Sequence, residues 1–219
     1  MANLRQRLRS DQSGFTLVEM IAAMLVFAIF AAILLTSTIG ITRAVSKSEL
    51  FVRSSSAELA VFQSFDRQIR YAESINFPGT GNDGNRYIEF RTGADSTADG
   101  TVLCTQWRFV PALKVIQSRY WTDVVGSTKS PWITKISTVV DLGGSTYPFK
   151  LVPATNVTDH ATQRLVLSIS SGTDLVTPGA AISTTFIARN SSNQSPSNLS
   201  THVVGASDTP VCLTTGTRS

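Results

Sequence analysis

The chain has 219 residues, of which 42% are hydrophobic and only 16% are charged, and its formal net charge is +4. This length allows one substantial domain and an anchor, and the Ser-, Thr-, Gly- and Asn-rich sequence after residue 35 excludes a multi-pass membrane protein. Nucleic acid is a disfavoured partner, because phosphate binding needs a clustered basic face and these Lys and Arg residues are thinly spread.

The N-terminal region combines a short basic arm with a long apolar segment. Arginines lie at positions 5, 7 and 9, and residues 15–35 are apolar apart from Thr16 and Glu19. At 1.5 Å per residue, about 21 helical residues cross the roughly 30 Å hydrocarbon core of a membrane. A secretory signal would have a shorter apolar core, of roughly 7–15 residues. We therefore predict a transmembrane helix over 15–35, with the basic arm in the cytoplasm and the rest of the chain outside.

Glu19 is the unusual residue of this segment. A charged side chain in a membrane helix costs about 2.5–3.5 kcal/mol, so such a residue is a functional candidate. One alternative is a carboxylate that reaches the membrane interface near the helix end. However, cleavage between Gly14 and Phe15 would create an ammonium group on Phe15, and residues four apart share a helix face. Glu19 is thus placed to neutralise that charge, in its own chain or in a neighbouring chain.

Residues 13–19, Ser-Gly-Phe-Thr-Leu-Val-Glu, resemble the processing motif of type IV pilins and type II secretion pseudopilins. The resemblance implies that a membrane aspartyl peptidase, the prepilin peptidase, cuts after Gly14 and N-methylates Phe15. It also implies that Glu19 supports methylation and docking to other pilins. Residues 1–14 would then be a cytoplasmic leader peptide that is removed.

We expect the helix to continue beyond the membrane to about Ser74, within an extracytoplasmic amphipathic half at residues 36–77. Ala57, Val61, Phe65, Ile69 and Ala72 recur at helical spacing and form one apolar stripe. Two pairs of opposite charge four residues apart, Glu49–Arg53 and Asp66–Arg70, favour the same helix. Residues 58–70 resemble the second half of the long helix in J-type minor pseudopilins and their pilus counterparts.

A β-rich extracytoplasmic domain is predicted over 78–219. Pro78 and Gly79 break the helix, and runs rich in Val, Ile, Phe, Tyr, Trp and Thr follow. The predicted strands are Arg86–Arg91, Val102–Val110, Leu113–Trp121, Trp132–Leu142, Arg164–Ser170 and Ile182–Arg189. We expect a tight hairpin at Pro111-Ala112 and a loop at residues 190–200. The predicted fold is α+β and pilin-like, with the long helix packed on an antiparallel sheet.

Cys104 and Cys212 are the two cysteines of the chain. An even number of cysteines in a chain that leaves the cytoplasm favours a disulfide. Two separate buried thiols are the alternative.

No pattern in the sequence predicts an enzyme, a cofactor or a metal site. His160 and His202 lie too far apart in sequence to suggest zinc, and no Gly-x-Ser-x-Gly motif is present. Asp95 and Asp99 fit part of a calcium loop, but the acid required at its twelfth position is replaced by Gln106, so a polar turn is favoured.

The favoured hypothesis is a non-enzymatic minor pilin or pseudopilin of a pilus, a secretion system or a DNA-uptake system. It would be a single-pass cytoplasmic-membrane protein that assembles with other pilins through its N-terminal helix. One alternative is a pilus-tip module that captures DNA or a surface ligand, for which Trp107, Trp121 and Trp132 could form an adhesive surface. Packing within the sheet explains these tryptophans more simply. The other alternative is a plain membrane-tethered domain.

Overall fold

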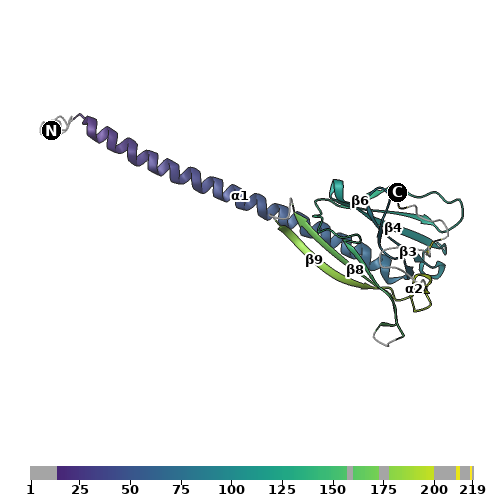
Figure 1. Ribbon diagram of the computed structural model, residues 1–219. Coiled ribbons are helices and arrows are strands. Elements are labelled where there is room, and N and C mark those ends of the chain that lie inside the picture. The colour runs from purple at the N-terminus through teal and green to yellow at the C-terminus, as the bar shows by residue number, and fades with distance from the viewer. Residues whose placement is uncertain (1–13, 157–159, 173–177, 200–210, 213–217, 219) are drawn as a thin grey trace, which may run out of the picture. The chain divides into compact units, whose positions relative to one another are not determined.

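The computed structural model describes residues 14–156, 160–172, 178–199, 211–212 and 218. The chain divides into two compact units, residues 1–49 and 50–219. The long helix α1 (Leu17–Arg70) contributes to both (Figure 1). The predicted cytoplasmic arm with its arginines lies outside the described residues.

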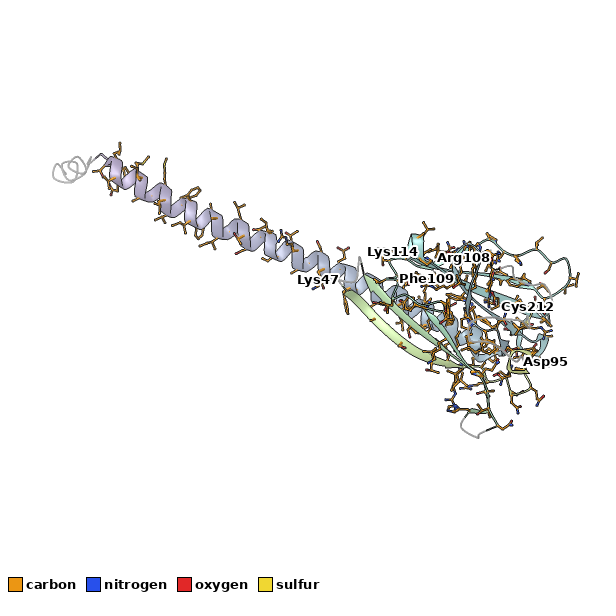
Figure 2. The ribbon with its side chains drawn as sticks, viewed as in Figure 1. Lys47, Asp95, Arg108, Phe109, Lys114 and Cys212 are labelled. Atoms are coloured by element: carbon orange, nitrogen blue, oxygen red, sulfur yellow. A yellow bond between two sulfur atoms is a disulfide. The ribbon has the colours of Figure 1, made fainter. Side chains whose placement is uncertain are left out.

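In the first unit, α1 is a helix without a buried face. Its Leu17–Glu49 segment is long and apolar enough to cross a membrane, and the side chains before Lys47 are exposed on every side of the helix (Figure 2). Thr36, Thr38 and Thr42 donate their hydroxyl hydrogen bonds to carbonyls four residues earlier, at 2.8–2.9 Å. These hydroxyls are therefore satisfied in apolar surroundings. A helix that is apolar all round needs a membrane or other helices to cover it.

In the second unit, the end of α1 packs against two sheets. Its Phe65 is fully buried, with ring centroids 4.0 Å from Trp107, 5.8 Å from Phe186 and 6.2 Å from Phe149. Val61 and Ile69 are buried beside it, so the predicted apolar stripe is confirmed at these three positions of α1. The side chain of Ala57 lies outside the described set. The predicted Asp66–Arg70 ion pair is present, and the Glu49–Arg53 pair cannot be followed because the Arg53 side chain is not described.

The larger sheet is six-stranded and antiparallel, with the order β1-β3-β4-β5-β6 and β2 also paired with β3. Its strands are β1 (Ala72–Ile75), β2 (Gly79–Thr80), β3 (Arg86–Thr92), β4 (Leu103–Val110), β5 (Val115–Thr122) and β6 (Ile133–Ile136). The short 3₁₀ helix Pro111–Leu113 connects β4 to β5, and Lys114 completes the turn with a left-handed φ of 55°. This confirms the predicted hairpin.

The smaller sheet contains β7 (Phe149–Val152), β8 (Arg164–Gly172) and β9 (Pro178–Ile187), paired in that order and antiparallel. The segment after β6 links the two sheets: the Val139 N–H donates to Lys114 O at 2.9 Å, and the Val140 N–H donates to Ser170 O at 2.7 Å. The long helix followed by antiparallel sheets confirms the predicted α+β, pilin-like fold class.

Several predicted boundaries were wrong. The helix ends at Arg70 and not within residues 74–77, because Arg70 O accepts a hydrogen bond from Arg189 N–H at 3.1 Å and residues 72–75 pair with β3. The predicted strand Trp132–Leu142 stops at Ile136, since Thr138 adopts a left-handed φ of 64° where the chain leaves the sheet. The strands β2 and β7 were not predicted.

The segment predicted as a loop at residues 190–200 is attached to the domain through buried serines. It includes the short helix α2 (Pro196–Leu199). Ser195 donates to Glu73 O at 2.6 Å, and the hydroxyls of Ser197 and Ser74 lie 3.1 Å apart.

Candidate functional site

The peptide bond between Gly14 and Phe15 lies in exposed chain just before α1. Gly14, Phe15 and Thr16 are not helical, and Phe15 is 81% exposed. A methyl group at Gly14 would meet nothing within 4 Å. A peptidase can therefore reach this bond without unwinding the helix.

Thr16 and Glu19 form a capping box at the start of α1. The Glu19 N–H donates to Thr16 Oγ1 at 3.3 Å, and Glu19 Oε2 accepts from the Thr16 N–H at a long 3.5 Å. Such reciprocal contacts satisfy backbone donors that a helix start leaves unpaired. This capping role was not predicted from the sequence, although Thr-x-x-Glu directly before an apolar run is its usual signal.

The capping geometry also favours a positive charge on Phe15. The Glu19 carboxylate sits in the first turn and already reaches the backbone N–H of Thr16, the residue that follows Phe15. An ammonium group created on Phe15 would lie one residue from that contact. Glu19 therefore lies close to the predicted cleavage bond. There its side chain caps the helix and also supplies a carboxylate.

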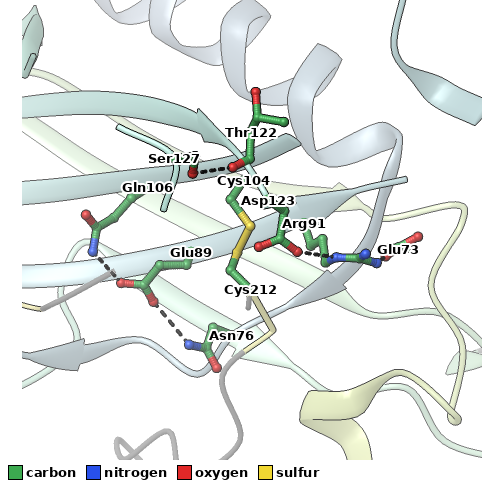
Figure 3. Close-up of a disulfide and its surroundings, with 10 residues drawn as sticks. All are labelled: Glu73, Asn76, Glu89, Arg91, Cys104, Gln106, Thr122, Asp123, Ser127 and Cys212. Carbon is green, nitrogen blue, oxygen red and sulfur yellow. Dashed lines mark hydrogen bonds and ion pairs between the residues drawn. A yellow bond between two sulfur atoms is a disulfide. The ribbon is translucent and has the colours of Figure 1, made fainter. Parts of the chain in front are cut away.

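The structure joins Cys104 of β4 to Cys212 by a disulfide, with 6.2 Å between their Cα atoms (Figure 3). Trp121 and Val211 pack around it in a small buried cluster. Asp123 lies beside the sulfurs, with its carboxylate buried and accepting a hydrogen bond from Arg91 Nε at 2.7 Å. Because the two sulfurs are bonded to each other, they are not available as thiolate ligands, and this cluster does not support a metal site.

A second set of contacts attaches the C-terminal region to the same face of the sheet. The buried Glu89 carboxylate accepts hydrogen bonds from Gln106 Nε2 at 2.7 Å and from Asn76 Nδ2 at 3.2 Å (Figure 3). It also pairs with Arg218 Nη2 at 2.8 Å. Together with the disulfide, this ion pair ties described residues near the C-terminus to β3 and β4.

Glu58 is a buried carboxyl group on the part of α1 that packs against the sheets. Its side chain is fully buried, and within the described chain neither oxygen accepts a hydrogen bond of normal geometry. Burial raises the pKa of Glu58, and the nearby Ser171 hydroxyl opposes this shift only in part. The burial of Glu58 was not predicted from the sequence, because it depends on the tertiary packing.

The remaining candidate residues have structural surroundings. Trp107 and Trp121 are buried, which confirms packing as their role, while Trp132 is partly exposed with Arg108 and Arg119 stacked at 4.0 and 4.2 Å from its ring centre. The Asp99 carboxylate accepts a 2.9 Å hydrogen bond from the Thr101 hydroxyl, as in a polar turn. His160 is exposed, and His202 lies outside the described residues.

A groove of about 710 Å³ lies beside the end of α1. Arg67 and Tyr71 line it on one side, and Tyr120, Ile133 and Lys135 line it on the sheet.

Comparison with known proteins gives one match, which coincides with this N-terminal site. Residues 9–35 match the family described as the prokaryotic N-terminal methylation motif. The match supports the prepilin and pseudopilin family and includes Gly14, Phe15 and Glu19. Neither the curated proteins nor the solved structures gave a match.

Proposed function

We propose that the protein is a structural, non-enzymatic minor pilin or pseudopilin of a type IV filament system. The prepilin peptidase would cut it after Gly14 and methylate Phe15. One observation carries the proposal. The accessible Gly14–Phe15 bond lies within the methylation motif, directly before a capped helix whose apolar side chains are exposed on all sides. Such a helix can exchange lipid for neighbouring helices without breaking contacts within its own chain.

In this account Glu19 sets the register of assembly. The Phe15 ammonium and the Glu19 carboxylate are each costly in hydrocarbon, and a pair costs far less. If the ammonium belongs to the next subunit, a misaligned subunit leaves both charges unpaired. The capping box holds the carboxylate at the start of the helix, ready for such a pair.

The minor role and the orientation of the chain in the membrane are also part of the proposal. Residues 58–70 resemble the corresponding helix of J-type minor pseudopilins, and the second unit is a large domain. A disulfide forms readily outside the cytoplasm, which agrees with a cytoplasmic N-terminus and an external C-terminal domain.

Two variants of Glu19 separate its charge from its capping role. Glu19→Gln can keep the capping box, because Gln serves at that position, but it removes the charge. Glu19→Ala removes both. Cysteines placed along residues 22–32 report contact with neighbouring pilin helices by disulfide crosslinking in membranes.

We expect both variants to be inserted and cut after Gly14, since losing a charge makes the helix a better membrane span. Both should lose crosslinks to partner pilins. Unchanged crosslinks in Glu19→Gln would show that the carboxylate acts only as a cap. A wild-type protein that forms no such crosslinks would favour the plain membrane-tethered domain.

A further inference from the structure

The sheet edges of this protein differ in length and charge. The edge strands β1, β6 and β7 have four residues each, and each carries one charged residue: Glu73, Lys135 and Lys150. The edge strand β9 has ten residues, Pro-Gly-Ala-Ala-Ile-Ser-Thr-Thr-Phe-Ile, and no charge. Proteins protect exposed edges from pairing with other chains by short strands and charged side chains. The β9 edge has neither protection.

The backbone groups on the open side of β9 follow from the pairing of its neighbours. The Ser168 N–H of β8 donates to Pro148 O, next to β7. Backbone N–H and C=O groups point alternately to the two sides of a strand, so those of the odd-numbered β8 residues point towards β9. Leu167 and Ile169 are opposite Thr184 and Ile182, so the even-numbered residues of β9 bond to β8.

The odd-numbered residues therefore direct their N–H and C=O groups away from β8. These residues are Ala181, Ser183, Thr185 and Ile187, whose side chains are exposed. No strand in the described part of the chain pairs with this side. Beyond the end of the strand, the Arg189 N–H on the same side donates to Arg70 O.

Apolar side chains lie next to this edge. Phe186 of β9 packs on Phe62 of α1, with 5.7 Å between ring centres. Leu59, one helical turn before Phe62, is 57% exposed, and Ile187 is 47% exposed. A strand added to β9 could therefore bury apolar surface as well as form backbone hydrogen bonds.

We propose that residues 181–187 of β9 pair with an extended, uncharged strand of a neighbouring pilin-type subunit. The proposal rests on the proposed function. Backbone donors and acceptors that alternate at strand spacing are complementary to another extended backbone. The edge has no Lys or Arg to neutralise phosphates, so it does not favour nucleic acid. A symmetric β9–β9 contact would close into a dimer, whereas a growing filament needs contacts between different surfaces. The occupant is therefore a strand of the neighbour other than its own β9.

Amide hydrogen exchange on the full-length protein tests this pairing, with the detergent-solubilised subunit compared against the same subunit in isolated filament assemblies. In the solubilised subunit the amides of Ser183 and Thr185 should exchange fast. In the assembly they should exchange at least about tenfold more slowly. The Thr184 amide, which bonds to β8, should be slow in both states and serves as the internal control.

Variants at Thr185 supply a second measurement. Thr185→Pro removes an outward N–H without removing a bond to β8, and Thr185→Lys adds an edge charge. Both should reduce the fraction of subunit in assemblies at least about fivefold, with an unchanged melting temperature for the lysine variant. Thr185→Val keeps the N–H and should match the wild type.

Fast exchange of Ser183 and Thr185 in a subunit that has entered the assembly would overturn the edge pairing and leave the proposed function standing. A subunit that never enters an assembly would overturn both. Slow exchange of the Ser183 and Thr185 amides in the purified subunit, together with a dimer in analytical ultracentrifugation, would show that β9 pairs with a second copy of this chain. That result would overturn the proposal.

Discussion

Glu19 and Glu58 lie on the same helix, but their surroundings differ. Glu19 is exposed at the capped N-terminus, where we propose that its charge serves docking. Glu58 is buried among packed elements, where a charge is costly. The sequence showed Glu19 clearly because a single acid interrupts an apolar run. It could not show Glu58, because a glutamate in an amphipathic segment is normally on the solvent side.

We predict that Glu58 makes the protein less stable as the pH rises. A raised pKa means that the folded state holds the proton more tightly than the unfolded chain, so the free energy of unfolding falls from about pH 4.5 upward and levels off above the folded pKa. Burial also raises the pKa of the neighbouring Tyr147, which therefore stays neutral through this range. Glu58→Gln should unfold at a higher temperature at neutral pH.

Thermal unfolding of the detergent-solubilised protein from pH 4 to pH 8 measures this effect. The exposed Asp95→Asn is the control, and its pH dependence should parallel that of the wild type. If Glu58→Gln kept the full pH dependence of the wild type, the pKa of Glu58 would not be raised in the folded protein.

At the scale of elements, the sequence predicted the strands with strong periodic patterns. The strands β3, β4, β5 and β8 lie where runs of Val, Ile, Phe and Trp indicated them. It failed where distant contacts decide the structure. Residues 72–75 continue the apolar stripe of the helix, yet they form β1, because the Ile75 N–H bonds to Gln163 Oε1 at 2.8 Å and the strand pairs with β3. The four-residue β7 was too short a pattern to recognise.

The disulfide is the element-scale link that we expect to matter most for stability. The cysteines are 108 residues apart, and closing a loop of this length stabilises the folded state by about 4–5 kcal/mol in the chain-entropy account. Replacing both cysteines by serine should lower the stability by up to about this amount. Denaturant unfolding with and without reductant measures the loss.

The double-serine variant is itself the control, because reductant should not change its unfolding midpoint. Peptide mapping without reductant should recover the segments around Cys104 and Cys212 as one linked species. Two alkylatable thiols in natively purified protein would contradict the link.

At the scale of the whole molecule, each of the two units has a different part in the proposed function. Residues up to Glu49 provide a helix suited to a membrane and to neighbouring helices. Residues 50–219 provide a packed domain in which the described edge strand β9 is unprotected. The N-terminal site was predictable because it is encoded in contiguous residues. The edge position of β9 was not predictable, because it depends on which strands pair with β9.

The mass of the mature protein tests the central claim most directly. Intact-mass measurement on membrane-extracted protein should show a chain that begins at Phe15 and carries one N-methyl group. Gly14→Ala should still be cut, whereas a bulky charged residue at position 14 should leave the leader attached. A wild-type chain that retains residues 1–14 in cells with active prepilin peptidase would contradict the account.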